Sequence, residues 1–439
     1  MFLEQIVDCF RIIGNGPLQG VVEINGAKNA VLPLIACGLL TDQELFLENV
    51  PLLGDVHCMI QLVRSLGMEV ARADHSLTLK TPSVTNFMAS YDHVRKMRAS
   101  VLVLGALLGR CGKATVSLPG GCAIGPRPVD LHIQGLEALG VHIDLVNGYI
   151  VAHAPGGRVL GGQYTFPKVS VGGTENLILA AVLARGESCI ENAAQEPEVS
   201  DLIECLCKMG AKIEGKGTSK LHIQGKDFLN GTRHYVLPDR LEMGTYIAAA
   251  LATKGELVLK GCNGELMDSY KPVLDQMGVL LREVQPSVFH IKSPDSWPGF
   301  HIQTQPFPGF PTDLQAQFMV LALFAHSASS IEENLFENRF MHVAELNRMG
   351  ANITVEGKTA FIPGQAQLIG APVMATDLRA SVSLVLAALA ARGETIVRRV
   401  YHLDRGYEDL VGKLSRCGAQ IERLTQEPGQ TAPIAQQGV

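Results

Sequence analysis

Charged and amide side chains stand at the start of several strongly apolar segments of this 439-residue chain. Such segments are expected to form buried helices, which do not need charges at that place for folding alone. The first turn of a helix carries unpaired N–H groups and the positive end of the helix dipole, so it favours anions. The residues concerned are Lys28 with Asn29, Arg98, residues 172–174, Arg240 with Glu242, Asp313, and Asp377 with Arg379.

A second set of reactive or charged residues precedes the amphipathic helices of the chain. It consists of Cys122 and Arg127 in PGGCAIGPRP, Arg339 in ENRFMH, and Arg405 in HLDRGYE. A cation at a helix N-terminus opposes the dipole and needs an anion beside it. The two sets together predict a group of anion sites. Two other interpretations stay open: the acidic residues are plain N-caps, or Asp377 pairs with Arg379 and Arg240 with Glu242 as structural ion pairs.

Cys122 differs from the other nine cysteines because it lies in a loop too rich in Gly and Pro for a helix or a central strand. Arg127 follows five residues later and would stabilise a thiolate. We therefore predict a reactive thiol on a loop over an active site, with an exposed thiol on an ordinary turn as the alternative. The other cysteines lie in apolar patterns without CxxC pairs, and we expect buried, reduced thiols.

The elements that must position these residues recur along the chain. A helical pattern ends in an apolar residue or Cys followed by Gly, and a β-type segment comes directly after it. The six glycines are Gly67, Gly140, Gly210, Gly278, Gly350 and Gly418, at intervals of 73, 70, 68, 72 and 68 residues. We expect each glycine to end its helix in the left-handed conformation. The charged residues of the first set stand 36 to 42 residues before these glycines, at equivalent places of six units.

Each unit of about 70 residues reads as a strand, an apolar helix, a strand, an amphipathic helix and one or two further strands. The most apolar helices, at 176–184, 318–325 and 378–391, are expected to lie inside a layer of sheets. The fold class is therefore α/β, with three units in each of two domains. We place the domains at 28–237 and 238–425, with residues 1–27 joining the second through a strand at 16–25. Residues 426–439 are predicted to be a disordered tail.

Composition excludes several classes of function. With 37 Lys and Arg against 43 Asp and Glu, the net charge of −6 disfavours nucleic acid and anionic membranes as partners. The longest apolar runs of about ten residues are half of a membrane span, and no secretory signal is apparent, so we expect a cytoplasmic protein. No dinucleotide, P-loop, serine-hydrolase or zinc motif is present, and we predict neither a metal nor a cofactor.

Nine segments carry a resemblance to a known family. They are INGAKNA, KMRAS, SLPGGCAIGPRPVDLHI, KVSVGGTEN, LPDRLEMGT, FPTDLQAQF, FENRFMHVAEL, ATDLRAS and DRGYE, spread from residue 24 to residue 408. The chain resembles the enolpyruvyl transferases that act on UDP-N-acetylglucosamine in peptidoglycan synthesis. The resemblance implies a two-domain inside-out α/β barrel, which agrees with the six units. It also implies transfer of the enolpyruvyl group of phosphoenolpyruvate to the 3′-hydroxyl of UDP-N-acetylglucosamine, with release of phosphate and without a cofactor.

The resemblance further implies roles for individual residues. Phosphoenolpyruvate is expected at Lys28, Asn29, Arg127 and Arg405. The nucleotide sugar is expected at Arg98, Arg127, Pro128, Val129, Asp130, Leu131, Lys168, Val169, Ser170, Val171, Asp313 and Leu335. Asp313 matches the general base, and Cys122 matches the residue that protonates phosphoenolpyruvate, forms a covalent cysteinyl adduct with it and reacts with fosfomycin. Arg339, Asp377 and Arg379 match further site residues whose separate roles stay open.

Two rival functions share most of these features. The sister enzymes that act on shikimate 3-phosphate have the same fold and chemistry, but the family resemblance gives them no cysteine loop like PGGCAIGPRP. A silent relative that binds the nucleotide sugar and regulates a partner is disfavoured because Lys28, Cys122, Asp313 and Arg405 are all present. The longer N-terminus and tail of this chain touch no predicted site residue.

Overall fold

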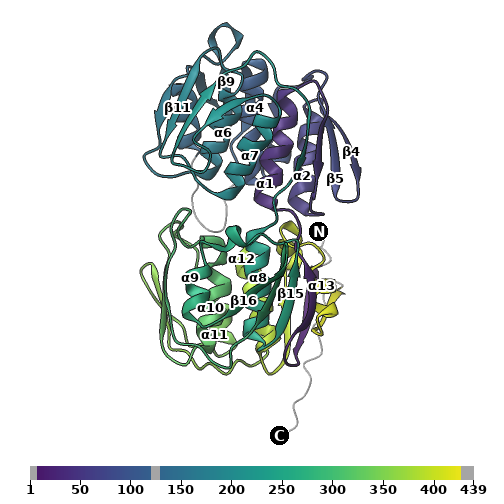
Figure 1. The fold of residues 1–439 in the computed structure, drawn as a ribbon, viewed down its shortest axis with the longest axis vertical. Helices are drawn as coiled ribbons and strands as arrows, with labels where there is room; N and C mark the ends of the chain where they lie inside the picture. The colour runs from purple at the N-terminus through teal and green to yellow at the C-terminus, as the bar shows by residue number, and fades with distance from the viewer. Residues whose placement is uncertain (1–6, 120–128, 427–439) are drawn as a thin grey trace.

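The computed structural model describes residues 7–119 and 129–426 of the chain. These residues form two lobes that lie one above the other in Figure 1. We call the upper one, coloured mainly purple to teal, the first lobe and the lower one, coloured mainly green to yellow, the second lobe. Within the described ranges no helix is both long and apolar enough to cross a membrane.

Each lobe contains three four-stranded sheets with one shared pattern: the first two strands are parallel and the others are antiparallel. The first-lobe sheets are β14 (Thr232–Tyr235), β3 (Leu45–Glu48), β5 (Ser76–Lys80), β4 (Glu69–Ala73); β6 (Met88–Ala89), β7 (Lys113–Ser117), β9 (Tyr149–His153), β8 (His142–Val146); and β10 (Gln163–Thr165), β11 (Glu187–Glu191), β13 (Lys220–Gln224), β12 (Lys212–Glu214). The second-lobe sheets are β2 (Gln19–Glu23), β15 (Glu256–Lys260), β17 (Val288–Lys292), β16 (Leu280–Gln285); β18 (His301–Gln303), β19 (Ser329–Glu332), β21 (Thr359–Ile362), β20 (Thr354–Glu356); and β22 (Pro372–Met374), β23 (Gly393–Arg398), β1 (Val7–Gly14), β24 (Gln420–Gln426).

Each unit contributes one inner and one outer helix. The inner helices are α1 (Lys28–Cys37), α4 (Leu102–Cys111), α6 (Val171–Ala181), α8 (Arg240–Ala252), α10 (Gln315–Phe324) and α12 (Leu378–Ala390). The outer helices are α2 (Gly54–Ser65), α5 (Asp130–Ala138), α7 (Pro197–Lys208), α9 (Lys271–Gln276), α11 (Met341–Arg348) and α13 (Leu410–Arg416). Short helices complete the set: α3 (Tyr91–Val94), η1 (Gly38–Leu40), η2 (Arg98–Val101), η3 (Pro155–Gly157), η4 (Gly264–Met267), η5 (Thr312–Leu314) and η6 (Val400–Arg405).

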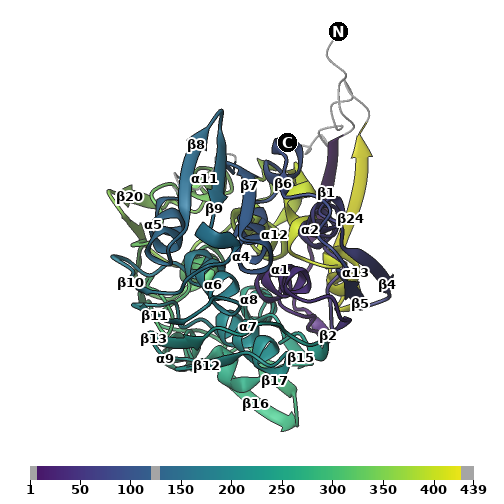
Figure 2. The same cartoon turned by 90° about the horizontal axis from the view of Figure 1, so that it is seen from above.

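The inner helices are surrounded by the sheets, as the sequence predicts. Every residue of α8 is buried, whereas the outer helix α11 buries only His342, Val343 and Leu346. Figure 2 shows α1, α4 and α6 near the middle of the molecule and strands such as β8, β11 and β4 towards its edge. An all-apolar helix is stable only where it is covered on all sides, so this arrangement follows from the sequence. The α/β inside-out fold class is confirmed.

The six repeat glycines end the outer helices as predicted. Their φ angles, all in the left-handed range, are 108° at Gly67, 85° at Gly140, 101° at Gly210, 72° at Gly278, 93° at Gly350 and 94° at Gly418. Residues with a Cβ rarely adopt this conformation, and glycine adopts it without a steric penalty. The next residues then enter the hairpin of each sheet.

Two separate hydrophobic cores fill the lobes. The first core is built from residues between Ala27 and Val236, and the second from Phe10 to Ile24 together with Leu241 to Ile421. The boundaries 28–237 and 238–425 stay a prediction, which these two cores support. Strand β24 runs to Gln426, the first residue of the predicted tail, and residues 427–439 lie outside the described ranges.

The chain passes between the lobes twice, at neighbouring places. Ala27 N donates to Leu237 O at 2.8 Å, and Asp239 N donates to Asn25 O at 2.8 Å. Before the first crossing, β2 lies in the predicted segment 16–25 and pairs in parallel with β15 of the second lobe, as expected. The N-terminal strands therefore belong to the second lobe, where a purple strand lies among green and yellow elements in Figure 1.

The expectation of buried cysteines is confirmed for five residues, holds only in part for Cys58, Cys111 and Cys189, and is wrong for one. Cys9, Cys37, Cys205, Cys262 and Cys417 are buried, and all nine cysteines within the described ranges are free thiols. Cys207 is exposed, because it lies on the outer helix α7 on the face opposite Cys205. Two positions along a helix turn a side chain by about 200°, away from the core.

Candidate functional site

Asp313 lies at the centre of an ion network inside the second lobe. Arg339 Nη2 contacts its Oδ1 at 2.6 Å, and Arg379 Nη2 contacts its Oδ2 at 3.2 Å. The three residues come from three elements: η5 before α10, the turn before α11, and the first turn of α12. Both arginines are buried, whereas Asp313 is partly exposed. The network therefore holds a partly exposed carboxylate against two buried guanidinium groups.

A second ion network joins the two lobes. Asp55, in the first turn of α2, accepts a hydrogen bond from Arg405 Nε at 2.8 Å. Lys28 Nζ, at the start of α1, lies 3.4 Å from the other oxygen of the same carboxylate. Lys28 and Asp55 belong to the first lobe, and Arg405 belongs to the second. Two of the predicted phosphoenolpyruvate residues thus meet on one buried acid.

Burial lowers the pKa of the Lys28 ammonium below its ordinary value, while the charge of Asp55 acts in the opposite direction. Arg379 and Arg405 also lower it, and Asp313 raises it. These influences mean that the two ion networks lie close enough to act on each other across the lobes. The pKa of Arg379 is raised by Asp313 against the effect of burial, so its guanidinium stays charged.

Sequence reasoning missed Asp55. An acidic residue in the first turn of a helix is common and stabilises the helix dipole, so its position gave no distinct signal. Its side chain is 4% exposed, which is rare for a carboxylate without a cation beside it. A buried acid and two cations from different segments form a group that only the tertiary structure reveals.

The alternative interpretation, in which Asp377 pairs with Arg379 and Arg240 with Glu242, is wrong. Asp377 caps α12 by accepting from the backbone N–H groups of Arg379 and Ala380. The side chain of Arg379 turns instead to Asp313, 66 positions away in the sequence. For Asp377 the N-cap interpretation therefore holds.

Arg240 pairs across the lobes with Glu198 of α7, at 2.9 Å from Nε and 3.3 Å from Nη2. Glu242 binds Lys413 at 2.7 Å. Burial raises the pKa of Glu242 above its ordinary value, and Lys413 works against this rise. Both partners of the Arg240–Glu198 pair are almost fully buried, so we treat it as a structural contact at the junction of the lobes.

A third group of predicted residues lies around His132 of α5, in the first lobe. Val129, Asp130 and Leu131 precede this histidine, and its ring lies 3.4 Å from where a Cβ on Gly172 would stand. Ser170 caps α6 by accepting from Gly173 N at 3.2 Å. Burial lowers the pKa of His132 to about 4, and the charge of Arg98 adds to this effect. Hence the predicted nucleotide-sugar residues of α5, α6 and η2 lie together.

Some of the remaining predicted residues lie within the described ranges and others lie outside them. Asn29 is the second residue of α1, Lys168 and Val169 precede the cap of α6, Val171 is its first residue, and Leu335 N donates to Glu333 at 2.9 Å. Cys122, Arg127 and Pro128 lie outside the described residues.

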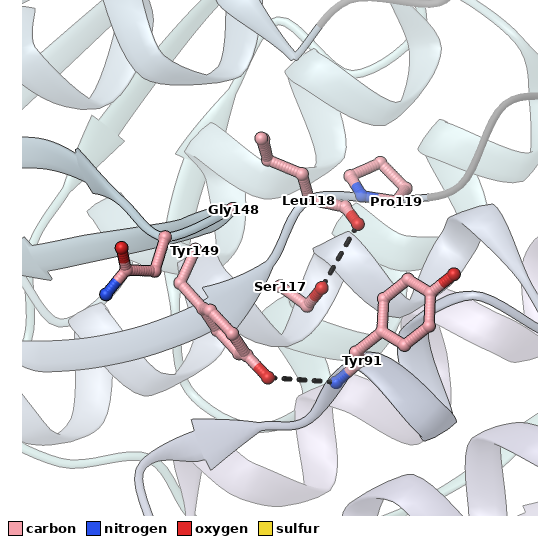
Figure 3. Close-up of a pocket in the computed structure, with 7 residues that line it drawn as sticks. Tyr91, Ser117, Leu118, Pro119, Gly148 and Tyr149 are labelled. Atoms are coloured by element: carbon pink, nitrogen blue, oxygen red, sulfur yellow. Dashed lines mark hydrogen bonds between the residues drawn. The ribbon is translucent and has the colours of Figure 1, made fainter.

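The larger of two described cavities measures about 390 Å³ and lies at the end of β7, where the chain approaches the predicted cysteine loop. Figure 3 shows the rings of Tyr149 and Tyr91 on the two sides of Ser117, with Leu118 and Pro119 above them in this view. Tyr149 OH accepts from Tyr91 N at 3.4 Å. None of the predicted charged residues lines this cavity. Over residues 7–119 and 129–426, no three His, Cys, Asp or Glu side chains form a group suited to a metal ion.

Comparison with known proteins gives consistent results. The family described as "EPSP synthase (3-phosphoshikimate 1-carboxyvinyltransferase)" matches residues 12–414. The chain is 52% identical over 428 residues to a protein of Rhodospirillum centenum and 55% identical over 418 residues to one of Acidiphilium cryptum. Both are named UDP-N-acetylglucosamine 1-carboxyvinyltransferase. The alignments cover 95% of this chain in each case, and 99% and 100% of those proteins.

Solved structures share the fold at much lower identity. The enolpyruvyl transferase NikO from Streptomyces tendae superposes with a TM-score of 0.88 at 23% identity, covering 96% of this chain and 100% of the other. An EPSP synthase from Acinetobacter baumannii superposes with a TM-score of 0.75 at 17% identity, over 95% of this chain and 100% of the other. At these identities the likeness establishes the arrangement of the lobes and no particular substrate.

Proposed function

The chain belongs to the enolpyruvyl transferase family, and from this we propose that it transfers the enolpyruvyl group of phosphoenolpyruvate to the 3′-hydroxyl of UDP-N-acetylglucosamine. Inorganic phosphate is released, and the product enters peptidoglycan synthesis. The observation that carries this proposal is identity above 50%, over nearly the whole of both chains, to proteins named for that activity. The ion network of Asp313 and the ion network that joins the lobes supply the charges that such a reaction requires.

Phosphoenolpyruvate is a small ligand with a phosphate and a carboxylate, so several cations must converge on it. Lys28 and Arg405 meet at one carboxylate in the described structure, and Arg379 acts on the charge of Lys28 from the other network. We propose that Lys28, Asn29, Arg127 and Arg405 hold phosphoenolpyruvate. Asp55 then competes with the incoming anion, because its carboxylate and the anionic groups of the ligand accept from the same two donors, Lys28 and Arg405.

We propose that the nucleotide sugar lies along the first lobe and reaches Asp313. The group around His132 places 129–131, Arg98 and the start of α6 side by side, and a helix N-terminus such as that of α6 favours a diphosphate. Pro128 and Arg127 would extend the same surface, as would Lys168, Val169, Ser170 and Val171. Leu335 would contact the sugar from the second lobe.

The proposed chemistry is addition followed by elimination. A proton adds to C3 of phosphoenolpyruvate, for which we propose Cys122 as the acid, and C2 becomes electron-poor. The 3′-oxygen bonds to C2 while the carboxylate of Asp313 takes the hydroxyl proton. The bond from C2 to the phosphate oxygen then breaks, a proton leaves C3, and the double bond returns. Arg339, Arg379 and Lys28 stabilise the negative charge of the ligand through these steps.

Phosphate release tests the proposal. Purified protein is mixed with phosphoenolpyruvate and UDP-N-acetylglucosamine, and inorganic phosphate and the enolpyruvyl sugar nucleotide are measured together. We expect both to form in equal amounts. Release with shikimate 3-phosphate in place of the nucleotide sugar would identify the sister activity, and no release with either acceptor would identify a silent relative; each outcome contradicts the proposal.

We also propose that the enzyme works in the cytoplasm, because phosphoenolpyruvate and nucleotide sugars are made there. Fractionation of cells that express the tagged full chain tests this location, and recovery mainly in the membrane or the medium would contradict it.

A further inference from the structure

The hydroxyl of Tyr407 touches the ion network of Asp313 from behind. Tyr407 lies two residues after Arg405, and only 3% of it is exposed. Its oxygen lies 3.2 Å from Arg379 Nη1 and 2.9 Å from Thr245 Oγ1 of α8. Gln317 Nε2 of α10 lies at 3.5 Å. A tyrosine outside the predicted site thus binds the arginine that holds the predicted base.

The direction of each hydrogen bond around Tyr407 is fixed by its neighbours. Thr245 donates its single hydroxyl proton to Leu241 O at 2.7 Å, so Thr245 Oγ1 can only accept from Tyr407. Burial raises the pKa of Tyr407, so the phenol keeps its proton and donates it to Thr245. The phenol oxygen is left to accept from Arg379, which has only donors.

This polarity divides the guanidinium of Arg379 between two partners. Nη1 donates to Tyr407 and Nη2 donates to Asp313 Oδ2, so the contact with the carboxylate uses one nitrogen. Arg379 is buried, and therefore water cannot replace the phenol as an acceptor for Nη1. Without Tyr407, we expect Nη1 to turn to the carboxylate of Asp313, which Nη2 already contacts.

We propose that Tyr407 is a positioning residue that limits Arg379 to one hydrogen bond with Asp313 and so preserves the basicity of that carboxylate. The proposal rests on the proposed function, in which Asp313 takes a proton from the 3′-hydroxyl. A forked contact with both nitrogens would stabilise the ionised carboxylate further and make it a weaker base. The phenol sets the strength of the base without touching substrate.

Charged groups of the described residues face Asp313 and its partners from several elements. Arg339 and Arg379 contact the carboxylate directly, and Lys28 of α1 senses its charge. Asp239, the cap of α8, acts on Arg379 and Tyr407 from the same side. A change confined to the contact between Arg379 and Asp313 should therefore shift the dependence of kcat on pH and leave its form unchanged.

The experiment compares two tyrosines. Tyr407→Phe removes the proposed acceptor, and Tyr246→Phe is the control, because Tyr246 is fully buried on α8 and its hydroxyl has no partner within the described residues. We expect Tyr407→Phe to lower kcat about tenfold, with the KM for UDP-N-acetylglucosamine within about twofold of the parent. The acidic limb of kcat against pH moves to lower pH. Tyr246→Phe leaves kcat and its dependence on pH unchanged.

A second variant and a crystal structure separate positioning from general damage. Thr245→Val leaves the phenol proton without an acceptor and is expected to move the pH limb in the same direction by a smaller amount. In crystals of Tyr407→Phe, both Nη atoms of Arg379 should lie within hydrogen-bond distance of Asp313. An unshifted limb in both variants, or Arg379 unmoved in the crystal, overturns the proposal.

The two proposals fail in different ways. If the parent protein releases no phosphate from its two substrates, the proposed function is wrong. The crystal structures of the parent and of Tyr407→Phe still decide the position of Arg379 in that case. If the parent is active and Tyr407→Phe behaves as Tyr246→Phe does, only the role of Tyr407 is wrong.

Discussion

The two lobes hold their charged residues in different ways. In the second lobe, Asp313, Arg339 and Arg379 pair with one another inside a single lobe. In the first lobe, Lys28 pairs with Asp55, and Arg405 from the other lobe pairs with the same carboxylate. One half of the candidate site is therefore preorganised by its own lobe, whereas the other half depends on how the lobes meet.

Two of the ion pairs that join the lobes differ in burial. The side chain of Arg405 is 40% exposed, so an anionic ligand can reach it, whereas that of Arg240 is 6% exposed in its pair with Glu198. Pairs of similar geometry thus have different uses: an accessible pair can exchange its acid for a ligand, and a sealed pair cannot. The predictions below test this division from the largest effect to the smallest.

The largest effect is expected from Asp313→Asn, which removes the base and leaves a side chain of the same size. We expect kcat to fall about 10³-fold, within the range that general bases contribute. Calorimetry should show UDP-N-acetylglucosamine binding close to that of the parent, because the second-lobe half keeps both arginines. A variant that retains more than a tenth of the parent rate would exclude Asp313 as the base.

Arg240→Met tests the sealed contact between the lobes. It leaves Glu198 buried without a cation, so the free energy of unfolding should fall by about 3 kcal/mol in urea titrations. Adding Glu198→Gln to the variant should recover part of the loss, because no buried charge then lacks a partner. A loss below about 1 kcal/mol would place this pair with ordinary surface pairs.

Two buried histidines allow a matched test of the lobes. His132 and His342 each stand eight residues before a repeat glycine, one in each lobe. Burial lowers the pKa of each to about 4. Unfolding exposes the ring and restores its ordinary pKa near 6.5, so the unfolded chain binds more protons between these values. Stability is therefore full above about pH 6.5 and falls as the pH drops towards 4.

At pH 5 each histidine should cost about 2 kcal/mol relative to pH 7. His342→Gln should remove about half of the combined loss, as should His132→Gln, when urea unfolding is measured at both pH values. The exposed His57→Gln is the control and should change nothing. His132 has Asn176 as a partner at 2.9 Å, whereas His342 has none within the described chain. An unchanged pH dependence in either variant would show that its ring is protonated in the folded lobe.

The smallest effect is expected at the accessible contact. Asp55→Asn removes the carboxylate that competes for Lys28 and Arg405, so the KM for phosphoenolpyruvate should fall about threefold. Glu408→Gln is the control, because Glu408 also joins the lobes, through Leu52 N at 2.7 Å, without binding either cation. A higher KM in Asp55→Asn would mean that Asp55 positions the cations and does not compete with the ligand.

Local features of the fold could be predicted from the sequence. A glycine in the left-handed conformation ends a helix through its own backbone. The helix ends at Gly67 and its five counterparts could therefore be predicted without any distant contact. The same holds for the inner helices, where an unbroken apolar run such as that of α10 allows only burial. The starts of these helices pointed to Lys28 and Asp313, and the family resemblance then implied their roles.

Pairing between distant residues could not be predicted. Arg379 stands two residues after Asp377 in the sequence, yet its guanidinium binds Asp313, 66 residues away. Asp55 looked like an ordinary first-turn carboxylate, and nothing in the motif DRGYE indicated a partner for Tyr407. Each acquires its role from a partner on another element, and a single sequence does not contain the distances between elements.

The position of β1 and β2 has a consequence for synthesis on the ribosome. Both strands emerge first, but their neighbours β15, β23 and β24 lie far along the chain. The first lobe lies between them and can fold as soon as β14 has emerged. The second lobe waits for β24, the last strand, which pairs with β1 from Val7 opposite Gln426. The ends of the described chain thus meet in one sheet, so a circular permutant that joins them through a short linker and opens elsewhere should keep both lobes.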